Sequence, residues 1–211
     1  MFPEVMERIA NASKRSGRNI EDITLVAVTK GRSLQEIETA VLSHGHRILA
    51  ENRIQEWRKK ASSLKGIEWH LVGNLQRNKV KYCTEANLIH SLNSHKLADA
   101  LELQGLKLNH RFRTLIEVNM TGEATKLGIE PENAAALLDY TRTLKHVSVE
   151  GLMGMAPFNP NPEMSRASFQ RLRKLCNELG LSVLSMGMSG DFEVAIEEGA
   201  TIVRIGSSLF L

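Results

Sequence analysis

Short apolar segments alternate with amphipathic helical stretches along the whole chain, and no other feature constrains the fold as strongly. Eight segments are typical of buried strands, and they cover residues 23–28, 47–50, 69–72, 88–92, 113–120, 147–155, 181–188 and 201–206. Helical spacing of apolar residues recurs between them, over 33–45, 51–64, 74–86, 93–105, 131–144, 165–180 and 191–199. Strands that alternate with helices form right-handed βαβ units around a parallel sheet buried on both faces. Eight such units favour closure into a (β/α)8 TIM barrel.

The rest of the pattern is consistent with one barrel domain over residues 1–211. The chain has 211 residues, of which 42% are hydrophobic, and this is enough for one sizeable core. Val5, Met6 and Ile9 recur at helical spacing, which predicts an extra N-terminal helix. A doubly wound open sheet is the alternative fold, but no G-x-G-x-x-G follows the first strand.

Composition and charge exclude several classes of protein. The 27 basic and 24 acidic side chains leave a net charge of +3, which predicts neither a nucleic-acid-binding nor a membrane-binding protein. The first residues contain no apolar run long enough for a signal peptide or a membrane span. Cys83 and Cys176 lie far apart in helical patterns, so we expect no disulfide framework, no metal site and a cytoplasmic location.

Polar residues collect where the predicted strands end. Chemistry in a barrel sits at the carboxyl ends of its strands, so these side chains are expected to meet at one mouth. They are Lys30, Glu51 and Asn52, His70, Asn119, Ser189, and Arg204 with Gly206, Ser207 and Ser208.

Each of these residues also has a purely structural interpretation. A lysine at a strand end usually extends its amine into water, and Asn52 could simply cap a helix. His70 lies within a strand, where a hydrogen-bonded core histidine is the commoner case, and Ser207 could cap the last helix. Arg204 is harder to dismiss, because "IVRIG" places it inside an apolar strand and a buried guanidinium needs a partner.

Two chemical features stand out at this mouth. The segments "GMSG" (187–190) and "IGSS" (205–208) carry small residues whose backbone N–H groups could hold an anion, and barrels often bind phosphate at these two loops. Lys30 is the second feature, because a desolvated lysine amine can attack a carbonyl group. Pyridoxal 5′-phosphate (PLP), a phosphate ester with an aldehyde, fits both features.

At this point the sequence resembles a known family, the YggS/PROSC-type pyridoxal phosphate homeostasis proteins, which are similar in fold to the N-terminal barrel of alanine racemase. The resemblance covers about residues 5–210. It is carried by "LVAVTK", "AENRIQE", "IEWHLVGNLQRNK", "VNMTGEATKLGI", "VEGLMGM" and above all "LSMGMSGDFEVAIEEGATIVRIGSSLF".

The resemblance implies a role for individual residues. Lys30 matches the lysine that forms the internal aldimine, and Arg204 matches the arginine that faces the pyridine nitrogen. Lys126 matches a family lysine that could act as a second acceptor for the cofactor. The remaining cofactor-binding positions are Ser189, Gly206 and Ser207 for the phosphate, Asn52 beside the cofactor, and Met188 next to the phosphate serine.

Some positions depart from the family pattern. After the first strand the family commonly has V-S-K-T-K-P, whereas this chain has "VTKGRS", without the second lysine and the proline. Gly190 replaces an acidic residue in "GMSGD". These departures affect loops and leave the lysine, the arginine and the phosphate-binding residues in place.

The same residues bear on activity. A guanidinium stays protonated, so a pyridine nitrogen that faces Arg204 is a weak electron sink, which disfavours an aminotransferase. Racemisation needs a base on each face of the substrate carbon, and Tyr82 and Tyr140 both lie in helical patterns away from the mouth.

We therefore expect a protein that holds PLP as a lysine Schiff base and acts in its homeostasis or delivery rather than in catalysis. The expected partners are PLP and apo PLP-dependent enzymes, and the chain is expected to be a monomer or a weak homodimer. Two alternatives stay open at this stage. One is a PLP-dependent amino-acid racemase of low activity, and the other is a cofactor-free Schiff-base aldolase that acts on a phosphorylated substrate.

Overall fold

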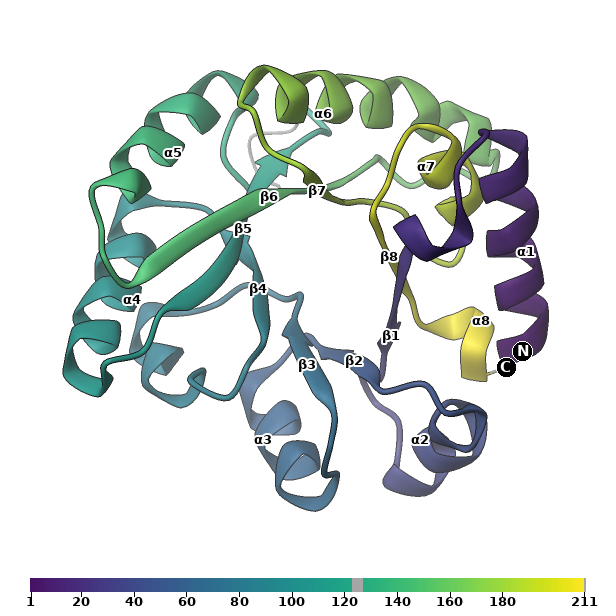
Figure 1. Ribbon diagram of the computed structural model, residues 1–211, viewed down its shortest axis with the longest axis horizontal. Coiled ribbons are helices and arrows are strands. Elements are labelled where there is room, and N and C mark those ends of the chain that lie inside the picture. The colour runs from purple at the N-terminus through teal and green to yellow at the C-terminus, as the bar shows by residue number, and fades with distance from the viewer. Residues whose placement is uncertain (123–126, 211) are drawn as a thin grey trace.

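Eight parallel strands close into a barrel in the computed structural model of the chain, which describes residues 1–122 and 127–210 (Figure 1). The strands are β1 Thr24–Val28, β2 Ile48–Glu51, β3 Glu68–Leu71, β4 Leu88–Leu92, β5 Phe112–Asn119, β6 Val147–Met155, β7 Val183–Ser185 and β8 Ile202–Ile205. Each strand pairs in parallel with the next, and β8 pairs with β1. The predicted TIM barrel is therefore confirmed, and the open sheet is excluded.

Helices surround the barrel on its outer side (Figure 1). They are α1 Phe2–Arg15, α2 Leu34–Ala40, α3 Ile54–Ser63, α4 His95–Leu108, α5 Ala134–Arg142, α6 Arg166–Glu178, α7 Phe192–Glu197 and α8 Ser207–Phe210. The described residues also form five short 3-10 helices in the connections between strands and helices: η1 Ile20–Asp22, η2 Leu42–His44, η3 Arg77–Tyr82, η4 Pro131–Asn133 and η5 Pro162–Ser165. The predicted extra helix α1 packs beside α7 and α8, so the two chain ends lie close together (Figure 1).

The structure corrects two predicted helices. The stretch 74–86 contains only the 3-10 helix η3, and the buried residues Val80 within it and Cys83 directly after it are three positions apart, which is the spacing of a 3-10 helix. Helix α4 does not end at Gly105. A Cβ on Gly105 would lie 2.4 Å from His146 Cβ, so this glycine permits close packing inside the helix.

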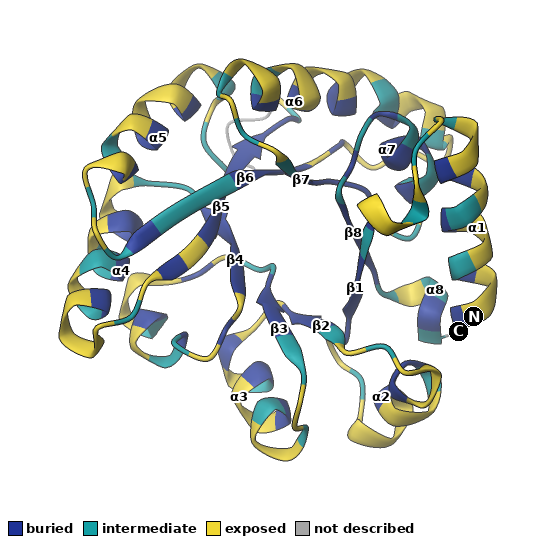
Figure 2. Ribbon diagram, in the orientation of Figure 1, coloured by how far each residue is buried: buried dark blue, intermediate teal, exposed yellow. Residues whose placement is uncertain are grey.

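The strands separate two packed layers. The outer layer fills the space between strands and helices, and Figure 2 shows buried residues along the barrel wall with exposed residues on the outer helix faces. The inner layer lies inside the barrel and is built around Val26, Val28, Ala50, Leu88, Leu115, Met153 and Ile202. Because strand side chains alternate between the two faces, these residues identify the inward positions of each strand.

Candidate functional site

Lys30 lies two residues beyond the end of β1, at the mouth of the barrel. Val26 and Val28 face the interior, so alternation along the chain directs Lys30 towards the opening. Thr29 stays in register, since its N–H donates to the Ala50 carbonyl at 2.9 Å. Lys30 is exposed. Burial therefore does not remove its amine from water, contrary to the expectation from the sequence.

A buried ion pair fixes the backbone directly before Lys30. The Lys60 ammonium on α3 pairs with the Glu51 carboxylate and donates to the Thr29 carbonyl at 2.6 Å. The Thr29 hydroxyl donates to the same carboxylate at 2.7 Å. This role of Lys60 was not predicted from the sequence, because the local pattern of α3 does not show that this lysine points inward.

The loops after β7 and β8 meet at Ser189. Its Oγ accepts hydrogen bonds from the backbone N–H groups of Gly206 and Ser208, at 3.3 and 3.4 Å. Two N–H groups that converge on one oxygen atom form the kind of concavity in which proteins bind phosphate. Ser207 lies between these two donors and is exposed.

Gly206 brings this loop against the end of β1. Ile205 pairs with Ala27, and a Cβ on Gly206 would lie 3.3 Å from the Val28 carbonyl oxygen. Gly206 and Ser207 therefore follow β8, which pairs with the strand that leads to Lys30, and Ser189 follows β7 on the other side of β8.

Arg204 extends into the barrel interior and is 5% exposed. Its guanidinium donates from Nη1 to Ser185 Oγ at 2.6 Å and from Nη2 to the Gly154 carbonyl at 3.1 Å. Burial lowers the pKa of Arg204 to about 10, although the charges of Asp191 and Glu117 oppose the shift. The side chain is therefore positively charged at neutral pH.

His70 belongs to a buried polar row rather than to the rim. Its ring contacts His90, with Nδ1 2.9 Å from Nε2, and His90 Nδ1 lies 3.0 Å from Ser185 Oγ. Burial holds the pKa of His90 well below its usual range. Sequence analysis missed His90 and Ser185, although both are polar residues at inward positions of apolar strands, the same signal that identified Arg204.

Glu117 on β5 is another residue of the site that was not predicted from the sequence. It is 3% exposed, and its Oε2 has no hydrogen-bond partner among the described residues. Burial raises the pKa of Glu117 to about 7, against the opposing effects of Arg204 and of a hydrogen bond from Asn93. The carboxyl group can therefore hold a proton near neutral pH.

Asn52 is exposed and follows β2 directly. The purely structural interpretation of this residue as a helix cap is wrong, since α3 begins after Arg53. Its backbone instead contacts the next strand end, because a Cβ on Gly73 would lie 2.2 Å from the Asn52 carbonyl oxygen.

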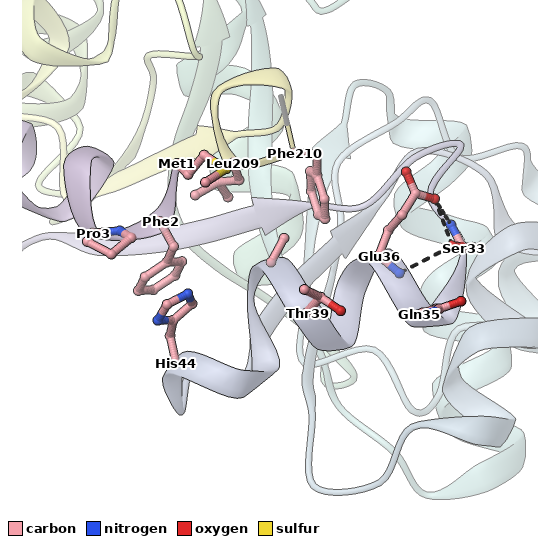
Figure 3. A pocket seen from close by; sticks show the side chains of 11 residues that line it. Met1, Phe2, Pro3, Ser33, Gln35, Glu36, Thr39, His44, Leu209 and Phe210 are labelled. Carbon is pink, nitrogen blue, oxygen red and sulfur yellow. Dashed lines mark hydrogen bonds between the residues drawn. The ribbon is translucent and has the colours of Figure 1, made fainter.

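Two cavities lie near these elements. One, of about 470 Å³, is at the mouth and is lined by Glu117, Asn119, Met155 and Met188 among others. Met188 is 39% exposed there. The other, of about 550 Å³, lies outside the barrel between α1, α2 and α8, and Figure 3 shows its lining of apolar residues such as Phe2 and Phe210 beside polar ones such as Glu36.

The other predicted residues have separate outcomes. Lys126 lies outside the described residues. Tyr140 donates its hydroxyl to Asp99 on the outer helices, and Tyr82 packs against the Arg58 guanidinium, so both tyrosines lie away from the mouth, as predicted.

Within residues 1–122 and 127–210 there is no cluster of side chains that could hold a metal ion. In the same ranges no helix is both long and apolar enough to span a bilayer.

Comparison with known proteins gives a consistent result. The family "Alanine racemase, N-terminal domain" matches residues 5–211. A pyridoxal phosphate homeostasis protein of Aquifex aeolicus is 47% identical, covering 98% of this chain and 94% of the relative. A protein of the same name from Deinococcus radiodurans is 41% identical, over 99% and 98% of the two chains.

Solved structures agree with these relatives. PipY of Synechococcus elongatus PCC7942 with PLP bound superposes with a TM-score of 0.82 at 32% identity, covering 98% of this chain and all of the PipY chain (100%). Alanine racemase of Clostridium difficile 630 shares the fold at 14% identity, with a TM-score of 0.76 over 97% of this chain and 56% of the racemase. The chain therefore belongs to the alanine racemase N-terminal domain family and, within it, to the pyridoxal phosphate homeostasis proteins.

Proposed function

We propose that this protein binds PLP at the barrel mouth, as a Schiff base with Lys30, and acts in PLP homeostasis and delivery rather than in catalysis. One observation carries the proposal. The Gly206 and Ser208 N–H groups converge on Ser189 Oγ beside the strand end that leads to Lys30. An amine and a phosphate-binding loop on adjacent strands are what an aldehyde phosphate requires.

The remaining residues of the mouth fit the same cofactor. Ser189, Gly206 and Ser207 would hold its phosphate, with Asn52 and Met188 beside it. When bound, PLP supplies a carbonyl group that condenses reversibly with amines. Arg204 would face its ring nitrogen through N–H groups that are not used by Ser185 and Gly154, because a guanidinium has five.

The charge on Arg204 argues against strong catalysis. A pKa of about 10 keeps the guanidinium protonated at neutral pH, so it cannot accept a proton from a pyridinium. A racemase also needs a second base at the mouth, whereas Tyr140 bonds to Asp99 on the outer helices and Tyr82 ends η3, packed against Arg58 of α3. Both features favour storage and release of the cofactor.

Location and partners follow from the same proposal. Cys83 and Cys176 are both free and buried, which suits a reducing cytoplasm. Apo PLP-dependent enzymes are the proposed recipients. We propose that residues 1–211 act as one domain, in a monomer or a weak homodimer.

Covalent labelling of Lys30 tests the proposal. Purified protein mixed with PLP should show a Schiff-base absorbance band, and borohydride should fix the cofactor on the peptide that contains Lys30. Lys30→Ala should remove both signals, whereas Lys59→Ala, at an exposed lysine of α3, should keep them. Labelling that persists in Lys30→Ala would place the reactive amine elsewhere.

Ser189→Ala tests the phosphate loop separately. The variant loses the oxygen on which the Gly206 and Ser208 N–H groups converge. PLP retention should weaken by about tenfold, equal to 1.4 kcal/mol, in a fluorescence titration, while the urea midpoint stays within error. Unchanged retention would refute this assignment of the phosphate site.

A further inference from the structure

A continuous row of hydrogen bonds crosses the barrel interior from Arg204 to the opposite end. Arg204 Nη1 lies 2.6 Å from Ser185 Oγ, which lies 3.0 Å from His90 Nδ1. His90 Nε2 lies 2.9 Å from His70 Nδ1, and His70 Nε2 lies 3.1 Å from Glu68 Oε1. Glu68 begins β3, and its side chain is 44% exposed at the amino end of the barrel.

When both rings are neutral, the chemistry of the two terminal groups fixes the direction of every bond in this row. A guanidinium has only donors, so Ser185 Oγ accepts from Arg204 and its own hydrogen goes to His90 Nδ1. His90 then carries its proton on Nε2 and donates to His70 Nδ1. His70 in turn carries its proton on Nε2 and donates to the Glu68 carboxylate. In this arrangement each ring carries its single proton on Nε2.

The inward residues of β1, β2 and β6 next to the row are apolar, namely Val26, Val28, Ala50 and Met153. The other charged groups near its ends are Glu117 and Arg113 on β5 and Asp191 before α7. Burial and the charge of Arg204 also disfavour protonation of His90.

We propose that Ser185, His90 and His70 are positioning residues that hold the Arg204 guanidinium at the mouth and couple it to the Glu68 carboxylate at the far end. Each member can keep its orientation only while the next accepts its hydrogen, so a change at Glu68 is transmitted to Arg204 through the rings. The functional consequence rests on the proposed function, in which Arg204 faces the cofactor ring.

The ring tautomers can be measured without any cofactor. Nitrogen-15 NMR of the purified protein at pH 7.5 should show His70 and His90 as neutral rings, each with its proton on Nε2. Glu68→Gln keeps a side-chain oxygen that can accept from His70, so both tautomers should persist. Glu68→Lys offers only donors, so His70 should move its proton to Nδ1, where it would face the His90 N–H and break the row. A charged ring, or a ring protonated on Nδ1 in the parent protein, would overturn the proposal.

A second pair of variants tests the effect on Arg204. Ser185→Ala removes a hydroxyl from the row, whereas Ser91→Ala removes an equally buried hydroxyl outside it, on the same strand as His90. The Arg204 guanidinium resonance should shift in Ser185→Ala and stay in place in Ser91→Ala. An unshifted resonance in Ser185→Ala would overturn the positioning role.

Cofactor binding completes the test. PLP retention should fall about tenfold, or 1.4 kcal/mol, in Ser185→Ala and Glu68→Lys, with a changed absorbance maximum, and should be kept in Glu68→Gln and Ser91→Ala. Equal retention in Glu68→Lys and Glu68→Gln would overturn the coupling. If the parent protein binds no PLP, the proposed function fails, and the NMR measurements still decide whether the row exists.

Discussion

Replacing Lys60 with methionine is the sharpest stability test that the structure offers. The Glu51 side chain is 0% exposed, and that of Lys60 is 11% exposed, so their ion pair is almost completely removed from water. Lys60→Met keeps the length of the side chain but leaves the Glu51 carboxylate without its cation. It also removes the hydrogen bond to the Thr29 carbonyl, directly before Lys30.

The expected loss follows from what remains around Glu51. Removing one partner of a buried ion pair costs about 3–5 kcal/mol. The Thr29 hydroxyl still donates to the carboxylate at 2.7 Å, so we expect the lower end, about 3 kcal/mol. For a domain of this size, such a loss lowers Tm by about 6–12 °C.

Urea unfolding followed by circular dichroism would measure this difference. Lys59→Met, one residue earlier on α3 and exposed, is the matched control and should change stability by less than about 0.5 kcal/mol. The double variant Glu51→Leu/Lys60→Met replaces the pair with apolar groups and should recover most of the loss. Equal stability of Lys60→Met and Lys59→Met would refute the reasoning.

Two further predictions concern the mouth. Gly187 has a φ of +89°, and a Cβ there would lie 2.5 Å from Ala195 Cβ, so Gly187→Ala should lose about 2–4 kcal/mol in urea unfolding. Gly190→Ala, in open space in the same loop, should be close to neutral, and an equal loss in both variants would contradict the close approach. Burial raises the pKa of Glu117 from 4.5 to about 7, so ionising it destabilises the folded state as the pH rises through this window. Glu117→Gln removes that penalty, so the unfolding free energy of the variant minus that of the parent should rise by about 2.5 kcal/mol from pH 5 to pH 8. The same difference at both pH values would show that the pKa is not raised.

Several parts of the site were predictable from the sequence because their signal is local. Arg204 stands out as a charge within an apolar strand, and the Gly-Ser segments around Ser189 and Gly206 mark loops that can hold an anion. Their meeting at one mouth follows from the rule that parallel strands of a barrel end on the same side. The roles of Lys30, Asn52, Met188 and Ser207 rested on the family resemblance and stay predictions until the labelling experiments are done.

Other parts depend on packing between distant segments. Lys60 has the sequence surroundings of a surface lysine, and only the contact of α3 with β2 shows that it is buried. A glycine after a helical stretch usually ends the helix, so Gly105 was expected to do so. The structure shows instead that a glycine is needed at this position because His146 packs closely against it. The exposure of Lys30 also depends on how the following loop lies, which no local pattern determines.

Local patterns were enough to predict the eight strands, most of the helices between them and the polar residues that end the strands, because short apolar segments and a period of 3.6 residues are properties of neighbouring positions. The hydrogen-bond row from Glu68 to Arg204 could not be predicted in this way, since its side chains come from β3, β4, β7 and β8. Closure of the barrel brings these four strands together. The register around the ring, which couples all eight strands, sets which inward residues from separate strands lie within hydrogen-bonding distance.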